Sequence, residues 1–365
     1  MSEYRQDPLS GRWVVIAEER ANRPNQFDVP YGTEGKGHKT RCPFCPGNEA
    51  DTPDEIDAIR SEDGTKNDSA WMTRVVPNRF PAITTQKKWG EWENDLLVHS
   101  EKLLFSHNQS FPGYGSHEVL IETPRHLLSI AEFDDHEILN MFRIYRRRLL
   151  AHREAGIWKH ALIFKNVGAS AGASLFHTHS QLMAMPFVPP PIRQELRREV
   201  RYYESHKRCY WCGLIDDELA EAKRVVSETE HFLMLCPFVS RFPMEISIFP
   251  KRHCSHFELM SENLTDALAF FVRKCVRTLE KAVFWNNGPL AYNMILKSGP
   301  FAVQEYCTDK NTQNSEDLSA CCHFYITLLP SLAKAAGFEW GTGLHINPIS
   351  PETAAQRLRD NSIDR

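Results

Sequence analysis

The chain has 365 residues, 42% of them hydrophobic and 25% charged, which is the composition of an ordinary globular protein and suggests about two domains. Its formal net charge of −4 excludes the basic surface that binding to nucleic acid or to a membrane requires, so we expect neither as a partner. The sequence opens without the apolar segment of a signal peptide and contains no run long enough for a transmembrane helix, so we expect a cytoplasmic protein.

The N-terminal region is predicted to begin with a strand and a polar loop. Residues 13–17 are apolar and follow a turn, which predicts a strand. Two arginines, Arg20 and Arg23, lie on the loop that follows. Arginines on loops are usually only solvated, although their guanidinium groups also suit the oxygens of a diphosphate.

A cysteine pair, Cys42 and Cys45, forms a C-x-x-C motif in a loop rich in glycine, lysine and proline. Such a pair is either half of a zinc site or a redox pair. Redox pairs usually open a helix after a strand, and this context predicts neither element, so a metal site is favoured. Two further ligands must then come from elsewhere in the chain.

Strands and a loop are predicted between this motif and the first long helix. The acidic and polar residues 51–66 predict a mobile loop, whereas residues 74–76 and 115–122 predict strands. In residues 134–155 the apolar side chains recur every three or four positions, which predicts a helix. An arginine run at 146–148 is expected on the solvated face of that helix.

Two more strands are predicted around a glycine-rich connection. Residues 160–165 and 182–185 are apolar and fit buried strands, and the glycines and serines of residues 168–174 connect them. Glycine lets the backbone approach a bound group closely, and a run of exposed N–H groups can hold a phosphate.

A row of polar side chains precedes the second of these strands. Residues His177, His179 and Gln181 are spaced by two, so on a strand they point to one face. Two histidines on a half-buried strand are often hydrogen-bonded and inert. The glycine-rich connection and the cysteine pairs favour a reactive site instead.

The second half of the chain repeats the first in outline. Residues 188–192, Val-Pro-Pro-Pro-Ile, are predicted to break regular structure and to separate a domain at 1–190 from one at 191–365. The order cysteine pair, strand ending in Pro-x-x-His, helix, strand and strand then occurs a second time. We infer an internal duplication.

The two copies differ at the row of polar side chains. His323 keeps the place of His177, whereas Tyr325 and Thr327 stand where the first copy has a second histidine and a glutamine. The second copy is therefore predicted to lack a catalytic site.

These motifs resemble a known family. Asn166-x-Gly168 followed by His177-x-His179-x-Gln181 is similar to the signature of the galactose-1-phosphate uridylyltransferase family, a branch of the histidine-triad superfamily. The resemblance spans nearly the whole chain. It implies an α+β fold of two tandem histidine-triad-like domains, each a mostly antiparallel sheet with helices, and it implies a homodimer.

The resemblance also implies two zinc sites, one in each copy, although iron can replace zinc in one of them. The implied ligands are Cys42, Cys45, His126 and His177 in the first copy, and Cys209, Cys212, His253 and His323 in the second. His117 and His256 are rival ligands, and His117 is expected to be structural. The other cysteines are expected to be free: Cys236, Cys254, Cys275, Cys307, Cys321 and Cys322.

In such a family member His179 is the nucleophile, and Gln181 donates a hydrogen bond to a phosphoryl oxygen. A neutral imidazole is a competent nucleophile, and covalent transfer through a nucleotidyl-histidine implies ping-pong kinetics with a nucleotide sugar and a sugar 1-phosphate or phosphate as substrates. The residues implied to contact the substrates are Arg20, Arg23, Asn78, Phe80, Asn166, Gly172, Ser174, Glu339, Thr342 and Asn347.

The base and the acceptor depend on finer features. Thr178 and Ser180 stand where many uridylyltransferases have proline and glycine, and this pattern is similar to relatives that act on ADP-glucose with phosphate. We expect uridylyl transfer between UDP-glucose and galactose 1-phosphate, with ADP-glucose phosphorolysis as the alternative. A hypothesis of another class is a zinc-stabilised nucleotide-binding module without catalysis.

Overall fold

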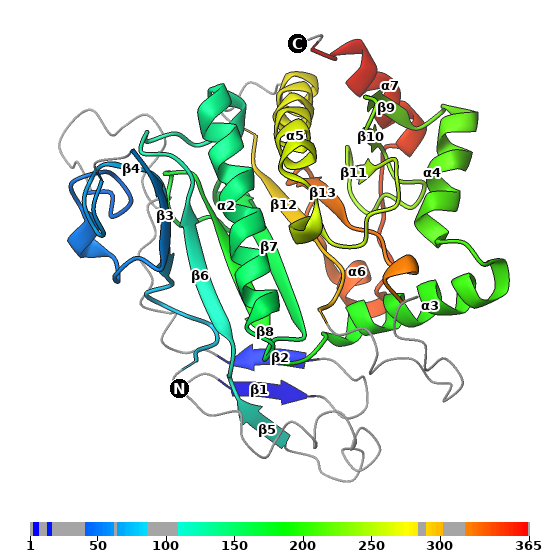
Figure 1. Ribbon diagram of the computed structural model, residues 1–365. Coiled ribbons are helices and arrows are strands. Elements are labelled where there is room, and N and C mark those ends of the chain that lie inside the picture. The colour runs from blue at the N-terminus through cyan, green and yellow to red at the C-terminus, as the bar shows by residue number, and fades with distance from the viewer. Residues whose placement is uncertain are drawn as a thin grey trace.

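The computed structural model describes residues 3–6, 13–16, 41–61, 64–85, 109–283, 290–301 and 318–363, so Arg20, Arg23 and Cys307 lie outside the described residues. A ten-stranded antiparallel sheet organises the chain (Figure 1). Its spatial order is β3 (Asp57–Arg60), β4 (Trp71–Pro77), β6 (Ser116–Ile121), β8 (His179–Met185), β7 (His160–Val167), β12 (Tyr292–Lys297), β13 (Tyr325–Pro330), β11 (Ile246–Pro250), β10 (Phe232–Leu235) and β9 (Val225–Glu228). A separate sheet has the order β2 (Trp13–Ile16), β1 (Glu3–Gln6) and β5 (Gln109–Pro112).

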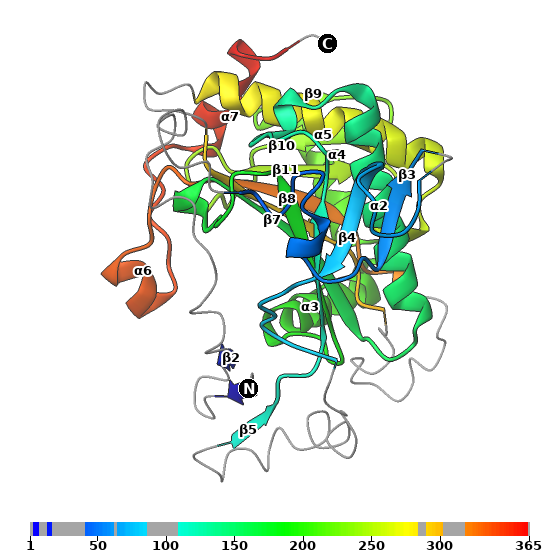
Figure 2. The ribbon, with the colours of Figure 1, turned by 90° about the vertical axis from the view of Figure 1, so that its left-hand side faces the viewer.

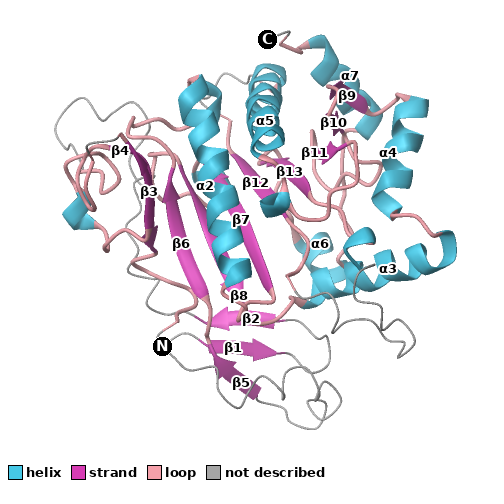
Figure 3. Ribbon diagram, in the orientation of Figure 1, coloured by secondary structure: helices cyan, strands magenta, loops and turns pink. Residues whose placement is uncertain are grey.

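Helices accompany the large sheet, and the predicted α+β class is confirmed (Figure 3). They are α2 (Asp135–Glu154), α3 (Pro190–His206), α4 (Tyr210–Glu221), α5 (Glu262–Ala282), α6 (Gly337–Thr342) and α7 (Pro351–Asp360). In the part of the chain that the structure describes, none of the helices is long and apolar enough to cross a membrane.

The two long helices begin at side-chain caps and bury one apolar face. Asp134 accepts a hydrogen bond from the backbone N–H of Glu137, whose carboxylate accepts one from the backbone N–H of Asp134, and Ser261 caps α5. The two helices lie side by side on one face of the sheet (Figure 1). Fully buried side chains such as Phe142 and Leu268 each contribute about 2 kcal/mol through burial.

The duplication predicted from the sequence is visible in the sheet. The first half has the order β3-β4-β6-β8-β7, and the second has β9-β10-β11-β13-β12, so each strand has a counterpart with the same neighbours. Strands β7 and β12 pair with each other and join the halves, with Asn166 opposite Asn293. The two copies therefore share one continuous sheet and one hydrophobic core.

The expected mobile loop at residues 51–66 contains a strand. Strand β3 pairs with β4, and the buried Glu55 receives a hydrogen bond from the buried Arg74 at 3.3 Å. The prediction was wrong because these polar side chains are satisfied by one another and therefore do not need solvent.

Two further expectations are corrected. The arginine run on α2 is not merely solvated: Arg147 donates to Asp57 at 2.6 Å, and Arg148 donates to the buried Glu118 at 2.7 Å. The prolines after β8 do not break regular structure but start α3, with Pro190 at its first position, where the missing N–H is not needed.

Candidate active site and two Cys–His clusters

The predicted reactive row lies where β8 begins, and β8 lies between β6 and β7 in the first copy's half of the sheet. Strand β8 starts at His179, so His177 precedes the strand instead of lying on it, in contrast to the expectation. The two imidazoles nevertheless share a face, because the ring of Phe44 lies 6.2 Å from that of His177 and 5.2 Å from that of His179.

The connection between β7 and β8 requires glycine at two positions. Gly168 and Gly172 have positive φ angles of 79° and 86°, a region that other residues rarely adopt. A Cβ atom on Gly168 would lie 2.7 Å from the Cβ of Ala291. A short 3-10 helix, Ala169–Ala171, lies between the glycines. The predicted connection is therefore compact and fixed in shape.

A chain of hydrogen bonds fixes the tautomer of His179. Its Nδ1 lies 2.8 Å from the backbone oxygen of His177, and a carbonyl oxygen only accepts, so Nδ1 carries the proton. The lone pair is therefore on Nε2. The N–H of Thr178, in the same peptide group as that carbonyl, donates to the backbone oxygen of Leu127 at 2.7 Å and polarises it. The arrangement suits a nucleophile at Nε2.

A second set of hydrogen bonds fixes the orientation of the Gln181 amide. The Nδ1 atom of His117 accepts from the backbone N–H of Ala82 at 3.0 Å, so Nε2 carries the proton and donates to Gln181 Oε1 at 2.9 Å. Asn78 also donates to this oxygen, at 3.5 Å. Because the oxygen is engaged, Gln181 presents its NH2 group as a donor. His117 was expected only to be structural.

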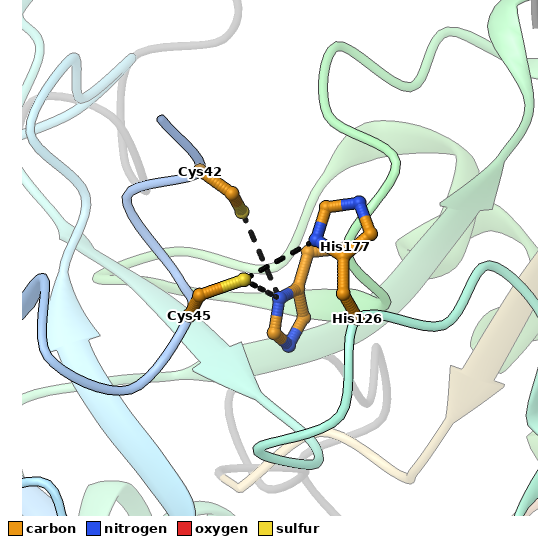
Figure 4. Close-up of side chains that lie close together, drawn as sticks. All are labelled: Cys42, Cys45, His126 and His177. Carbon is orange, nitrogen blue, oxygen red and sulfur yellow. Dashed lines mark hydrogen bonds between the residues drawn. The ribbon is translucent and has the colours of Figure 1, made fainter. Parts of the chain in front are cut away.

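The first Cys–His cluster consists of Cys42, Cys45, His126 and His177 (Figure 4). Their sulfur and nitrogen atoms all lie within 4.8 Å of one another. Cys45 Sγ is 3.3 Å from His126 Nδ1 and 3.5 Å from His177 Nδ1. His177 donates its other ring proton to the backbone oxygen of Thr123 at 2.8 Å, which turns the Nδ1 lone pair toward the cysteines.

The second cluster, Cys209, Cys212, His253 and His323, repeats the first. Cys212 Sγ lies 3.4 Å from Nδ1 of His253 and 3.7 Å from Nδ1 of His323. Both histidines direct Nε2 at a backbone oxygen, at 3.0 Å in each case. His256 points elsewhere, toward the backbone oxygen of Pro300 at 3.2 Å.

The donor sets of both clusters are compatible with a metal such as zinc. Two sulfur and two nitrogen donors close a tetrahedron and leave no open position, as in structural zinc sites. Burial lowers the pKa of His177 to about 4, so the imidazole is neutral as a ligand must be, and burial raises the pKa of Cys42 to about 12, which a bound cation would offset. None of the described cysteines forms a disulfide.

Other predicted substrate contacts of the first copy surround this row. Asn166 is the last residue but one of β7, close to the connection, and accepts from Asn293 at 2.8 Å. Ser174, on the connection, is buried, and the backbone N–H of Phe80 donates to Asn78 Oδ1 at 2.9 Å.

The predicted hexose contacts lie on α6 and just beyond it, in a segment that stands out from the body of the chain (Figure 2). Glu339 caps α6 by accepting from Ala336 N at 2.9 Å, and Thr342 donates to the backbone of the same helix. Asn347 donates to Ser240 and Phe242 backbone oxygens. Within one chain Glu339 and Thr342 therefore stabilise their own helix, whereas Asn347 ties the segment to residues 240–242.

The corresponding site of the second copy is occupied by the chain's own side chains. By strand register, Tyr325 and Lys297 take the positions of His179 and Asn166. Lys297 donates to Tyr325 at 3.0 Å, and both bond to Glu195 of α3. Helix α3 thus covers the place that corresponds to His179 of the first copy.

The sequence matches the models of two domains of one family. Residues 1–189 match the N-terminal domain of galactose-1-phosphate uridyl transferase, and residues 195–363 match its C-terminal domain.

Relatives and solved structures extend this similarity. The chain is 30% identical to ADP-glucose phosphorylase from Arabidopsis thaliana over 99% of this chain and 93% of the relative, and 30% identical to galactose-1-phosphate uridylyltransferase from Thermotoga maritima over all of both. The crystal structure of the Arabidopsis ADP-glucose phosphorylase with bound ADP-glucose is similar with a TM-score of 0.69 and 29% identity, covering all of both chains. A uridylyltransferase structure of 24% identity, TM-score 0.72 and 98% coverage of both chains shares the fold. The chain belongs to the galactose-1-phosphate uridyl transferase family.

Proposed function

We propose that the protein transfers a nucleotidyl group from a nucleotide sugar to a phosphate acceptor by a ping-pong mechanism through a covalent intermediate on His179. The observation that carries the proposal is the bond from His179 Nδ1 to the His177 carbonyl, which leaves the Nε2 lone pair as the nucleophile. A nucleotide-binding module without catalysis would not need a fixed tautomer.

In the first half-reaction the Nε2 lone pair of His179 forms a bond to the α-phosphorus, and the bond from that phosphorus to the sugar phosphate breaks. Sugar 1-phosphate leaves with the electron pair. The imidazole becomes a cation, and the His177 carbonyl stabilises the positive charge through Nδ1–H. In the second half-reaction a phosphate oxygen of the acceptor attacks phosphorus, and the P–N bond breaks.

The chain provides hydrogen-bond donors for the phosphoryl oxygens in this reaction. Gln181 donates its NH2 group. In the connection at 168–174, the N–H groups of Ala171, Gly172 and Ala173 donate to carbonyl oxygens of the connection itself and thereby fix its shape beside the strands. An amide supplies a hydrogen bond but no proton, which favours transfer over hydrolysis. The two Cys–His clusters would hold zinc, or iron in one of them, as structural ions that keep the His177 segment and its counterpart at His323 in place.

For the donor and acceptor we propose UDP-glucose and galactose 1-phosphate first, with ADP-glucose and inorganic phosphate as the second candidate. The second is favoured by Thr178 and Ser180 and by the 30% identity with a protein named ADP-glucose phosphorylase. The other relative of equal identity is a uridylyltransferase, which supports the first.

We also propose a homodimer in which the α6 segment reaches the partner's substrate site. This segment exposes apolar side chains, among them Trp340 with an exposed fraction of 79% and Leu344 with 63%. Light scattering with wild type and Trp340→Ala tests it: a monomeric wild type would refute the proposal, and a dimer weakened by the substitution would support it.

The test of the reaction is intact-protein mass spectrometry after incubation with UDP-glucose or ADP-glucose without acceptor. We expect a uridylyl or adenylyl increment on wild type, none on His179→Asn, and the wild-type result for His136→Asn, a control at an exposed position on α2. The donor that gives the increment identifies the base. No increment with either donor, together with tight nucleotide binding, would favour the binding module.

A further inference from the structure

A buried ion pair lies behind the nucleophile, on the face of the sheet that carries α2. Lys165 Nζ is 2.5 Å from Glu122 Oε2, and both side chains are completely buried. The surroundings are otherwise the apolar core between sheet and helices. Moving two charges into such an interior costs several kcal/mol per ion, and a buried pair is weak support for stability.

The hydrogen bonds of this pair converge on the segment that carries His179. Glu122 accepts from Thr178 Oγ1 at 2.7 Å, from Ser180 Oγ at 2.5 Å and from the hydroxyl of Tyr145 at 2.5 Å. Lys165 donates to Thr178 Oγ1 and to the backbone oxygen of His179 at 3.2 Å. The residues between the functional side chains are therefore held from behind, while His177, His179 and Gln181 face the opposite side.

The pair also controls the segment that orients His177. The backbone oxygen that receives the His177 ring proton belongs to Thr123, which directly follows Glu122. Fixing Glu122 therefore fixes the acceptor for His177 as well as the strand that carries His179. The carbonyl that sets the His179 tautomer lies between these two anchored points.

The second copy is an internal control. Strand register places Leu296 and Ile326 opposite each other in β12 and β13, at the positions of Lys165 and Ser180, and Phe324 corresponds to Thr178. All three second-copy residues are buried and apolar. The copy without a nucleophile thus dispenses with the charges, so the duplicated fold does not require them.

We propose that Glu122, Lys165, Thr178 and Ser180 are positioning residues that hold the His177–His179 segment in its reactive geometry. This inference rests on the proposed function of His179. It also assigns the hydroxyls of Thr178 and Ser180 to the buried pair, so they do not select the nucleotide base. The Thr and Ser that replace proline and glycine are then a consequence of the charges behind the strand.

The test uses substitutions with matched shapes. Thr178→Val removes the hydroxyl without changing the volume, Thr178→Ser keeps it, and Lys165→Met removes the charge while retaining the apolar stem. The first readout is the rate of nucleotidyl-enzyme formation in a single turnover with each donor. The second is the 15N signal of the His179 ring in the resting enzyme at fixed pH, assigned by its absence in His179→Asn.

We expect Thr178→Val and Lys165→Met to slow adduct formation by roughly ten- to a hundredfold, the loss typical of a small misplacement of a reacting group. In both variants the 15N shift of the His179 ring should move away from the value of a single Nδ1–H tautomer. The affinity for the donor and the ratio of the rates with the two donors should stay unchanged. Thr178→Ser should behave as wild type.

A Thr178→Val variant with the wild-type rate of adduct formation and an unchanged His179 signal would overturn the inference. So would an unchanged signal together with a changed ratio of the rates with the two donors, because the Thr178 hydroxyl would then take part in recognising the donor. The thermal unfolding midpoint shows whether a variant is folded. If Lys165→Met does not fold, the isosteric Thr178→Val alone tests the positioning role. If wild type forms no adduct, the proposed function fails, whereas the NMR signal still tests the positioning role.

Discussion

His117 should control the reaction through the orientation of one amide. Its Nε2–H donates to Gln181 Oε1 at 2.9 Å, while its Nδ1 accepts from Ala82 N at 3.0 Å. The two nitrogens can be replaced separately. In His117→Asn the side-chain oxygen can still accept from Ala82 but the donor to Gln181 is lost, whereas His117→Gln can keep the donor and lose the acceptor.

The size of each effect follows from these contacts. Without the bond from His117 the Gln181 oxygen keeps only the long 3.5 Å bond from Asn78, so the amide can turn its oxygen toward the phosphoryl group. This costs about 1 to 2 kcal/mol of transition-state stabilisation, or roughly five- to thirtyfold in rate. His117→Gln leaves the buried N–H of Ala82 without an acceptor, which should lower the free energy of unfolding by about 1 to 3 kcal/mol.

Two assays separate the two substitutions. Single-turnover adduct formation, followed by mass spectrometry, should be slow for His117→Asn and near the wild-type rate for His117→Gln. In urea unfolding, His117→Gln should lose more free energy of unfolding than His117→Asn. A His117→Asn variant that forms the adduct at the wild-type rate would refute the assignment of the Gln181 amide. Equal damage to both properties in both variants would mean that His117 serves only the fold.

Three further predictions concern metal, pH and backbone. Cys45→Ser should lower the zinc content, measured by elemental analysis, from about two ions per chain to about one and should stop adduct formation. Cys212→Ser should lower the zinc content equally but chiefly reduce the stability of the fold. An unchanged metal content in either variant would contradict the assignment of that cluster as a metal site. Burial alone would raise the pKa of Glu118, but hydrogen bonds from His152 and Arg148 lower it from 4.5 to about 2. The resulting stabilisation of the folded state, up to about 3 kcal/mol, is present above pH 4.5 and is lost as the pH falls toward 2. Glu118→Gln should therefore lower the free energy of unfolding, measured with urea, at about pH 7 and hardly change it at about pH 2. In Gly172→Ala the new Cβ would meet only Asn166 Nδ2, at an ordinary contact distance of 3.9 Å, but the residue keeps a φ of 86°. The substitution should therefore cost about 1 kcal/mol by backbone strain alone, and a cost near zero would mean that the connection relaxes.

The sequence contained enough to assemble both clusters and the duplication. Ligand spacing and the repeated order of motifs are local or pairwise signals, and the structure brings together all eight implied Cys and His side chains. His126 was preferred over His117, and His253 over His256, from the Pro-x-x-His pattern, and the geometry agrees with both choices.

What the sequence did not reveal depends on contacts between distant strands. His117 and Gln181 are brought together only by the register of β6 against β8, in which Val119 lies opposite Gln181. Lys165 and Glu122 looked like ordinary strand residues, because nothing local shows that their charges are buried against each other. A polar segment such as residues 51–66 likewise becomes a strand only when partners such as Arg74 satisfy it.

The second copy bears on what the metal is for. It keeps the cysteines, the histidines and the bond from a ligand Nε2 to a backbone oxygen. Yet Tyr325 stands in the place of His179, the proposed nucleophile, and Glu195 of α3 bonds to this tyrosine. If a cluster served the chemistry directly, it would have no purpose in a copy without chemistry. A cluster that instead ties a cysteine loop to the segment before a strand serves both copies equally. The persistence of the second cluster therefore argues that the first also acts on structure, by holding His177 two residues from the nucleophile.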